Sequence, residues 1–218
     1  MLRLQKIDEH TRPDHSYLAE DDECYYLREY TPRQGPYYSS TNDLIINLKK
    51  PVDRRGRAEY QYKESAIGQA GDELRSVLNA DWLKKAVLVP MPCSKAKGEA
   101  LYDDRLLRVI HRMTLGLDCA IRDLVLQTGN LPSFHDGCRL PPNMLVNYYK
   151  VDELLCAGAN PEVVGIFDDV LTTGSHFKAV KAVIQGRWPG VPVIGVFIAR
   201  RYIPRDELAA TDAGQPEG

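Results

Sequence analysis

Three short runs of apolar residues stand out along the chain, at positions 86–90, 163–167 and 191–199. Each run is too short for a buried helix and is bounded by proline, glycine or acidic residues, which predicts buried β-strands. Amphipathic stretches at 101–113 and 176–185 follow the first two runs and predict helices. This alternation favours an α/β fold with an open, mainly parallel, twisted sheet and helices on both faces.

The pattern before residue 86 predicts two more helices. Ser40 or Thr41 is placed to cap the first helix, and a second amphipathic stretch follows it along the chain. The core-facing residues are Leu44, Ile45 and Leu48 in the first helix and Ile67, Ala70, Leu74, Val77 and Leu78 in the second. We expect both helices to cover the sheet, and we expect a further strand at 121–126.

Two stretches lack any such periodicity. Residues 127–143 are rich in Gly, Pro and Asn, and we interpret them as a mobile functional loop. Residues 205–218 are polar and mostly small, which predicts a disordered tail. The chain has 218 residues and 44% hydrophobic content, enough for one sizeable core. We therefore assign 37–204 to the main domain and 1–36 to an extension that contributes to a small hood or to the core edge.

Charge limits the classes of partner. The net charge of −2 gives no general attraction to nucleic acid or to an anionic membrane. The one local basic run, which we interpret as a solvated face and loop, consists of Lys49, Lys50, Arg54, Arg55 and Arg57. Direct nucleic-acid binding through this run is therefore the least favoured function.

Targeting and metal-binding signals are equally sparse. The charged start of the chain at 3–12 lacks the apolar centre of a secretion signal, and no apolar run approaches the length of a membrane span. We therefore expect a cytoplasmic protein without a membrane partner. Five cysteines lie far apart and form no CxxC pair, which favours neither a zinc ribbon nor a disulfide framework.

The segment 163–175 carries the strongest chemical signal. Its apolar strand runs into Asp168 and Asp169, and a turn of small residues then opens a helix. Ligands of open parallel sheets bind outside the carboxyl ends of the strands, and a helix N-terminus receives phosphate through its backbone N–H groups. An acid pair beside such a turn suits a sugar phosphate with a vicinal diol. The alternative is a plain strand-to-helix turn whose acids and threonines cap the helix, but it does not account for adjacent acids ending a buried strand.

This segment resembles the 5-phosphoribosyl 1-pyrophosphate (PRPP) binding motif of type I phosphoribosyltransferases. The resemblance implies that family's open parallel sheet with a small variable hood, and Mg²⁺ held at Asp168 and Asp169 largely through PRPP or water. It implies that these acids bind the ribose hydroxyls and that 172–175 hold the 5′-phosphate. The implied PRPP-binding residues are Asp168, Asp169, Val170, Leu171, Thr172, Thr173, Gly174 and Ser175. His176 departs from the motif, because many relatives have Thr or Ser there.

A second segment, 90–98, resembles the pyrophosphate loop of the same superfamily. The residues implied for that loop are Cys93, Ser94, Lys95, Ala96 and Lys97. Lys95 and Lys97 would act catalytically on the departing diphosphate, although a lysine-bearing loop alone is more often solvated surface. We interpret Cys93 as a packing residue and not as a nucleophile.

Two arginines are candidates for further ligand contacts. Arg105 follows Asp103 and Asp104, and it either reaches the pyrophosphate or forms an ion pair within its own helical stretch. Arg139 lies in the loop before the PRPP-like strand, where an ordinary surface loop is an equal alternative. Neither arginine has a distinctive local motif.

The wider pattern across 37–201 is similar to the ComF-type branch of phosphoribosyltransferase-like proteins, without the N-terminal zinc finger, because only Cys24 lies in that region. The resemblance implies an enzyme that transfers phosphoribose from PRPP to an unidentified nitrogen acceptor and releases pyrophosphate. The rival hypothesis is a PRPP- or nucleotide-sensing subunit that acts through a protein or nucleic-acid partner. Either form is compatible with a homodimer.

Overall fold

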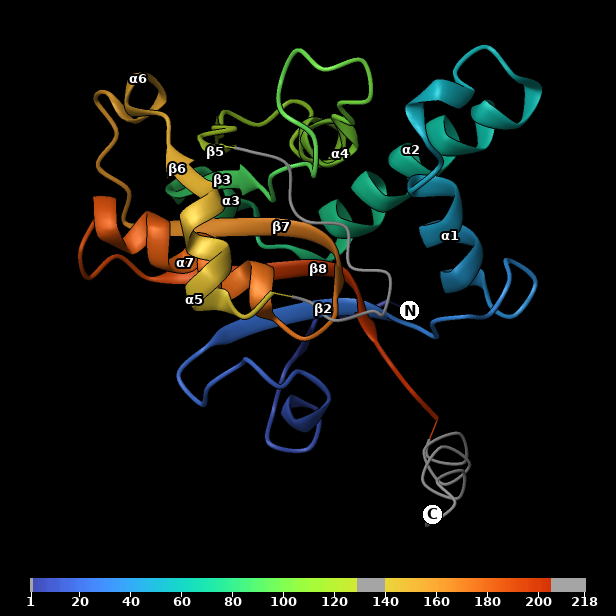
Figure 1. Cartoon of the computed structure of the whole chain (residues 1–218), viewed down its shortest axis with the longest axis horizontal. Coiled ribbons are helices and arrows are strands. Elements are labelled where there is room, and N and C mark those ends of the chain that lie inside the picture. Colours follow the sequence, from blue (N-terminus) through green and yellow to red (C-terminus); the bar gives the residue numbers. More distant parts are fainter. Residues whose placement is uncertain (1, 129–139, 205–218) are drawn as a thin grey trace, which may run out of the picture.

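The computed structural model describes residues 2–128 and 140–204 (Figure 1). Within these ranges the chain forms a six-stranded sheet, a separate two-stranded sheet and helices on the faces of the larger sheet. The larger sheet consists of β1 (Gln5–Lys6), β2 (Glu23–Tyr30), β3 (Ala86–Pro90), β4 (Ala120–Ile121), β7 (Val163–Leu171) and β8 (Val193–Arg201). The smaller sheet pairs β5 (Val125–Gln127) with β6 (Tyr149–Val151) antiparallel.

Seven α-helices lie in the described part of the chain. They are α1 (Ser40–Leu48), α2 (Gln61–Val77), α3 (Ala80–Lys85), α4 (Arg105–Met113), α5 (Pro142–Leu145), α6 (Glu153–Cys156) and α7 (Ser175–Arg187). Short 3₁₀ turns are η1 (Arg12–Asp14), η2 (Val52–Arg54), η3 (Ala58–Tyr60) and η4 (Val146–Tyr148). None of the helices in this part of the chain is both long and apolar enough to cross a membrane.

The strand order of the larger sheet is β1-β2-β8-β7-β3-β4. All neighbours pair parallel except β1, which runs antiparallel to β2 at one edge. The predicted mainly parallel α/β sheet is confirmed. Between β3 and β7 the winding reverses, because β3 leads through α4 to β4 on one side and β7 leads through α7 to β8 on the other. In sheets of this kind such a reversal creates a crevice for ligands.

Alternating side chains of the central strands build a core on each face. Val164 and Ile166 of β7 pack with Phe177 and other apolar residues of α7, whereas Phe167 of β7 faces the opposite way. That second core contains the predicted apolar residues of α1 and α2, together with residues of α3 and α4. Burial on both faces explains why these strands appear in the sequence as unbroken apolar runs.

Several predicted element bounds needed adjustment. The strand predicted at 191–199 spans 193–201, and the helix predicted at 176–185 spans 175–187. The strand predicted to end at Phe167 continues to Leu171, because Val170 and Leu171 are buried and pair with residues of β8. The helix predicted at 101–113 begins only at Arg105, because the preceding residues form turns. Ser39, one residue before the predicted cap, caps α1 by accepting a hydrogen bond from the Asn42 backbone N–H.

The single strand predicted at 121–126 was wrong. Ile121 ends β4, and Val125 begins β5 in the other sheet. Between them, the Arg122 N–H still donates to the Leu88 carbonyl of the larger sheet, while the Leu124 carbonyl already accepts from Asp152. The chain therefore passes from one sheet to the other around the charged pair Arg122 and Asp123, which interrupts the apolar residues of this stretch.

The segment 1–36 supplies β1 and β2, so its second strand lies inside the sheet next to β8. Of the stretch predicted as a mobile loop, residues 129–139 lie outside the described residues, as does the predicted tail at 205–218.

Candidate functional site

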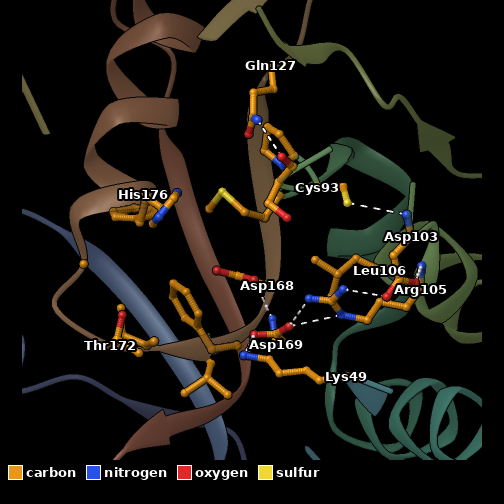
Figure 2. Close-up of a pocket in the computed structure, with 18 of the residues that line it drawn as sticks. Lys49, Cys93, Asp103, Arg105, Leu106, Gln127, Asp168, Asp169, Thr172 and His176 are labelled. Atoms are coloured by element: carbon orange, nitrogen blue, oxygen red, sulfur yellow. Dashed lines mark hydrogen bonds and ion pairs between the residues drawn. The ribbon is translucent and has the colours of Figure 1, made fainter. Parts of the chain in front are cut away.

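A cavity of about 200 Å³ opens at the carboxyl ends of β3 and β7, where the winding of the sheet reverses (Figure 2). The residues that follow β3 line one side, and the acids and turn of β7 line another. Gln127 of β5 and Tyr149 of β6 close it from the smaller sheet. The cavity therefore lies where the topology alone predicts a ligand site.

Asp169 is bracketed by two cations at the base of this cavity (Figure 2). Its Oδ1 lies 2.8 Å from Lys49 Nζ, and its Oδ2 accepts from Arg105 Nη2 at 2.6 Å and Nε at 3.2 Å. Burial alone would raise the pKa of this carboxyl, but the charges of Lys49 and Arg105 outweigh it and hold the pKa below its usual value. Asp169 is thus an ionised anchor for both cations.

Asp168 lines the same cavity in a different electrostatic environment. Its Oδ1 accepts the Asp169 backbone N–H at 2.7 Å. Burial raises the pKa of Asp168, and the negative charge of Asp169 raises it further. Of the two acids, Asp168 therefore gains most from an incoming cation or from a hydroxyl donor.

The turn after β7 is shaped by Gly174, which has a φ of +84°. A Cβ at this position would also lie 2.7 Å from Leu18 Cδ2, so any other residue would be strained and would require the Leu18 side chain to shift. No side chain caps α7 and no acid occupies its first turn, so the helix N-terminus has no negative group of its own. Of the four predicted phosphate-binding residues, Thr172 and Gly174 line the cavity, whereas Ser175 is buried and its hydroxyl accepts from Thr173 Oγ1 at 3.3 Å.

Residues of the N-terminal segment bond to the backbone carbonyls of this turn. The wholly buried His15 contacts the Thr172 carbonyl through Nδ1, and the Tyr17 N–H donates to the Thr173 carbonyl at 2.9 Å. Burial lowers the pKa of His15, which favours its neutral form. Together with the contact of Leu18 with Gly174, these bonds fix the turn from an irregular segment more than 150 residues away in sequence.

The predicted pyrophosphate loop divides between two hollows. Cys93 and Ser94 line the main cavity, and Cys93 Sγ accepts the Asp103 N–H at 3.4 Å, which is a packing and backbone contact. Lys95 and Lys97 line a smaller adjoining hollow, together with Ala96. Lys97 Nζ lies 2.9 Å from Asp123 Oδ2 and donates to the Asp123 carbonyl.

The two candidate arginines have different positions. Arg105 lines the cavity and also pairs with Asp103 just before α4, so a local ion pair is present, and contact with a pyrophosphate stays a prediction. Its pKa is raised by Asp169 and Asp103 even though burial acts against the charge. Arg139 lies outside the described residues.

Two residues of the cavity had not been assigned to the site from the sequence. Lys49, the first member of the basic run, reaches Asp169, so the run is more than a solvated face. Tyr149 donates to or accepts from His176 Nδ1 at 2.6 Å, and burial together with the charge of Asp168 raises the pKa of its hydroxyl. The His176 departure from the motif is thereby linked to a residue of the smaller sheet. No local pattern marks either residue, because each comes to the cavity from a separate element.

Asp168 and Asp169 together offer few free carboxylate oxygens for a magnesium ion. Both oxygens of Asp169 already contact cations, which leaves Asp168 as the available carboxylate. Among residues 2–128 and 140–204, no three His, Cys, Asp or Glu side chains gather as a metal site. Mg²⁺ commonly keeps several waters and uses one or two carboxylates plus phosphate oxygens, so this donor set suits an ion that arrives with a phosphorylated ligand.

No protein-family model matches the chain, and a comparison with curated proteins finds no significant match. The motif and the geometry of the cavity are therefore the features that point to a function.

Proposed function

We propose that this protein binds PRPP with Mg²⁺ and transfers its phosphoribosyl group to a nitrogen nucleophile, with release of pyrophosphate. One observation supports this function best. The acid pair, the Gly174 turn and the first residues after β3, up to Ser94, converge on one cavity at the reversal of the sheet. A type I phosphoribosyltransferase would use these same three elements for the ribose, the 5′-phosphate and the diphosphate.

Each part of PRPP has a matching group. The 5′-phosphate accepts hydrogen bonds from backbone N–H groups at the turn that opens α7. The first turn of this helix contains no acidic residue that would repel the phosphate. The ribose hydroxyls donate to Asp168, whose pKa is raised by burial and by the charge of Asp169. The diphosphate lies toward Lys49 and Arg105, with Lys95 close by in the adjoining hollow.

The reaction breaks the bond between the anomeric carbon and the pyrophosphate oxygen while the nitrogen forms its bond to that carbon. The proton that the nitrogen then loses passes to solvent or to the released pyrophosphate. Negative charge moves onto the leaving diphosphate, and the two cations beside Asp169 stabilise it as fixed electrostatic groups. Mg²⁺, when bound, neutralises further charge on the diphosphate. The acids hold the sugar and need not transfer a proton. Gln127 and Tyr149 from the smaller sheet take the position of the hood and face the acceptor side.

The direct test is an assay of the purified protein with PRPP, Mg²⁺ and a panel of bases, amines and nucleic acids. Release of pyrophosphate that depends on one acceptor supports the proposed transfer. Binding of PRPP without turnover favours the sensing subunit, and a partner protein captured only with PRPP present would strengthen that alternative. Absence of PRPP binding contradicts both.

A further inference from the structure

Lys63 is a wholly buried lysine behind the cavity, on α2. Its ammonium has three hydrogens, and three acceptors surround it at hydrogen-bond distance. The acceptors are the Leu48 carbonyl at 2.9 Å, the Lys50 carbonyl at 2.8 Å and Asp103 Oδ2 at 2.7 Å. A buried charge is tolerated only when it is fully paired in this way, so the position of the ammonium is tightly determined.

These three bonds lead to both cations of the site. The two carbonyls flank Lys49, so Lys63 fixes the backbone from which the Lys49 side chain reaches Asp169. On the other side, Asp103 Oδ2 also accepts Arg105 Nη1 at 2.8 Å, and Asp103 Oδ1 accepts the Arg105 backbone N–H at 3.1 Å. Arg105 in turn binds Asp169.

The contacts therefore close a ring. It runs from Lys63 through Asp103 and Arg105 to Asp169, then through Lys49 and its flanking carbonyls back to Lys63. Members of such a network polarise and orient one another, so the loss of one member displaces the others. Figure 2 shows the part of the ring that faces the cavity, where Asp103, Arg105, Asp169 and Lys49 lie side by side.

We propose that Lys63 is a positioning residue of this site, which sets the places of Lys49 and Arg105 and thereby the affinity of the cavity for a diphosphate group. The affinity part of this inference rests on the proposed function. Lys63 itself does not line the cavity, so its effect on a ligand passes through the two cations.

The test compares Lys63→Met, which keeps the stem but removes the ammonium, with Arg28→Met. Arg28, in β2, is a suitable control because it does not line the cavity. It forms a largely buried ion pair with Glu73, which is on α2 like Lys63. Calorimetry with inorganic pyrophosphate and with ribose 5-phosphate measures the two halves of the ligand separately. For Lys63→Met we expect pyrophosphate affinity to fall about tenfold or more and ribose 5-phosphate affinity to change less than about twofold.

A second measurement does not depend on any ligand. The Nε–H of Arg105 donates to Asp169, and its NMR resonance, assigned with Arg105→Lys, reports that contact. We expect this resonance to shift or broaden in Lys63→Met and to stay unchanged in Arg28→Met. Lys63→Gln removes the charge but keeps an N–H donor, and it takes the place of Lys63→Met should that variant fail to fold.

The outcomes separate the two proposals. If the wild-type protein binds neither PRPP nor pyrophosphate, the proposed function fails and the affinity part of this inference fails with it, while a changed Arg105 resonance still supports positioning. An unchanged Arg105 resonance with unchanged pyrophosphate affinity in a folded Lys63→Met variant would overturn the role of Lys63. Equal losses for Lys63→Met and Arg28→Met would overturn it as well, because they would reflect stability alone.

Discussion

Asp168 and Asp169 are neighbours in the sequence, yet they have opposite electrostatic roles in the cavity. Lys49 and Arg105 keep the pKa of Asp169 low, whereas burial and the nearby charge of Asp169 raise the pKa of Asp168. Asp169 therefore holds Lys49 and Arg105 in place, whereas Asp168 can still accept hydrogen bonds from a ligand. A ligand with a diol and a metal-bound diphosphate would place the diol at Asp168 and the diphosphate at the two cations held by Asp169.

At the same scale, adjacent lysines allow a matched test of the cation site. Lys49 reaches Asp169 in the cavity, whereas the Lys50 side chain bonds to Asn47 and lies over the Tyr62 ring, 5.4 Å from its centroid. Lys49→Met should weaken PRPP binding by about 1 to 2 kcal/mol, because one charge-assisted contact to the diphosphate is lost.

Lys50→Met carries the same change in charge and size, and it should leave the PRPP dissociation constant nearly unchanged in the same calorimetric titration. Equal losses in the two variants would mean that the basic run attracts the ligand only through its general charge, and the contact assigned to Lys49 would then be incorrect.

At the scale of elements, the turn between β7 and α7 depends on Gly174. Gly174→Ala combines a backbone strain of about 1 to 2 kcal/mol with an overlap against Leu18. Gly190 has a similar φ of +79° but open space around it, so Gly190→Ala isolates the strain. In urea unfolding, Gly174→Ala should lose at least about 1 kcal/mol more than Gly190→Ala, because the overlap adds to the strain.

The same pair of variants tests the phosphate turn. Gly174→Ala should weaken ribose 5-phosphate binding, while Gly190→Ala, which lies at the far end of α7, should not. Identical unfolding free energies for the two variants would show that Leu18 does not constrain the turn.

The elements also show which parts of the structure the sequence reveals. The acids and turn at 168–175 were predictable because they are contiguous, and the helices α1 and α2 because their apolar spacing is regular. Strand β2 was missed because Arg28 and Glu29 interrupt its apolar residues. Both charges are neutralised by distant partners, Arg28 by Glu73 and Glu29 by Arg200, which no local pattern displays. Lys49 and Tyr149 were not assigned to the site because their contacts in the cavity are also with residues distant in the sequence.

At the scale of the whole molecule, the N-terminal segment is part of the core. Strand β2 pairs along its length with β8, and the side chain of Asp22, completely shielded from solvent, bonds Lys178 and Lys181 of α7 at 2.6 and 2.7 Å. The segment also holds the phosphate turn through His15 and Tyr17.

A chain that begins at residue 37 should therefore lose cooperative folding, because it exposes one edge of β8 and leaves the α7 lysines without Asp22. Thermal unfolding followed by circular dichroism measures this, with the full chain as the control. A sharp transition at a similar temperature in the shortened chain would show that 1–36 is a dispensable extension.

The central claim is that the cavity beside the acid pair binds PRPP. The most direct measurement is calorimetric titration of PRPP, with and without Mg²⁺, into the wild-type protein, Asp168→Asn and Asp169→Asn, each checked for an intact fold by circular dichroism. We predict binding that requires the divalent cation and is clearly weakened in both variants, because each substitution keeps the shape of the side chain and removes its charge. Unchanged PRPP affinity in both folded variants, or no PRPP binding by the wild-type protein with Mg²⁺ present, would contradict the account.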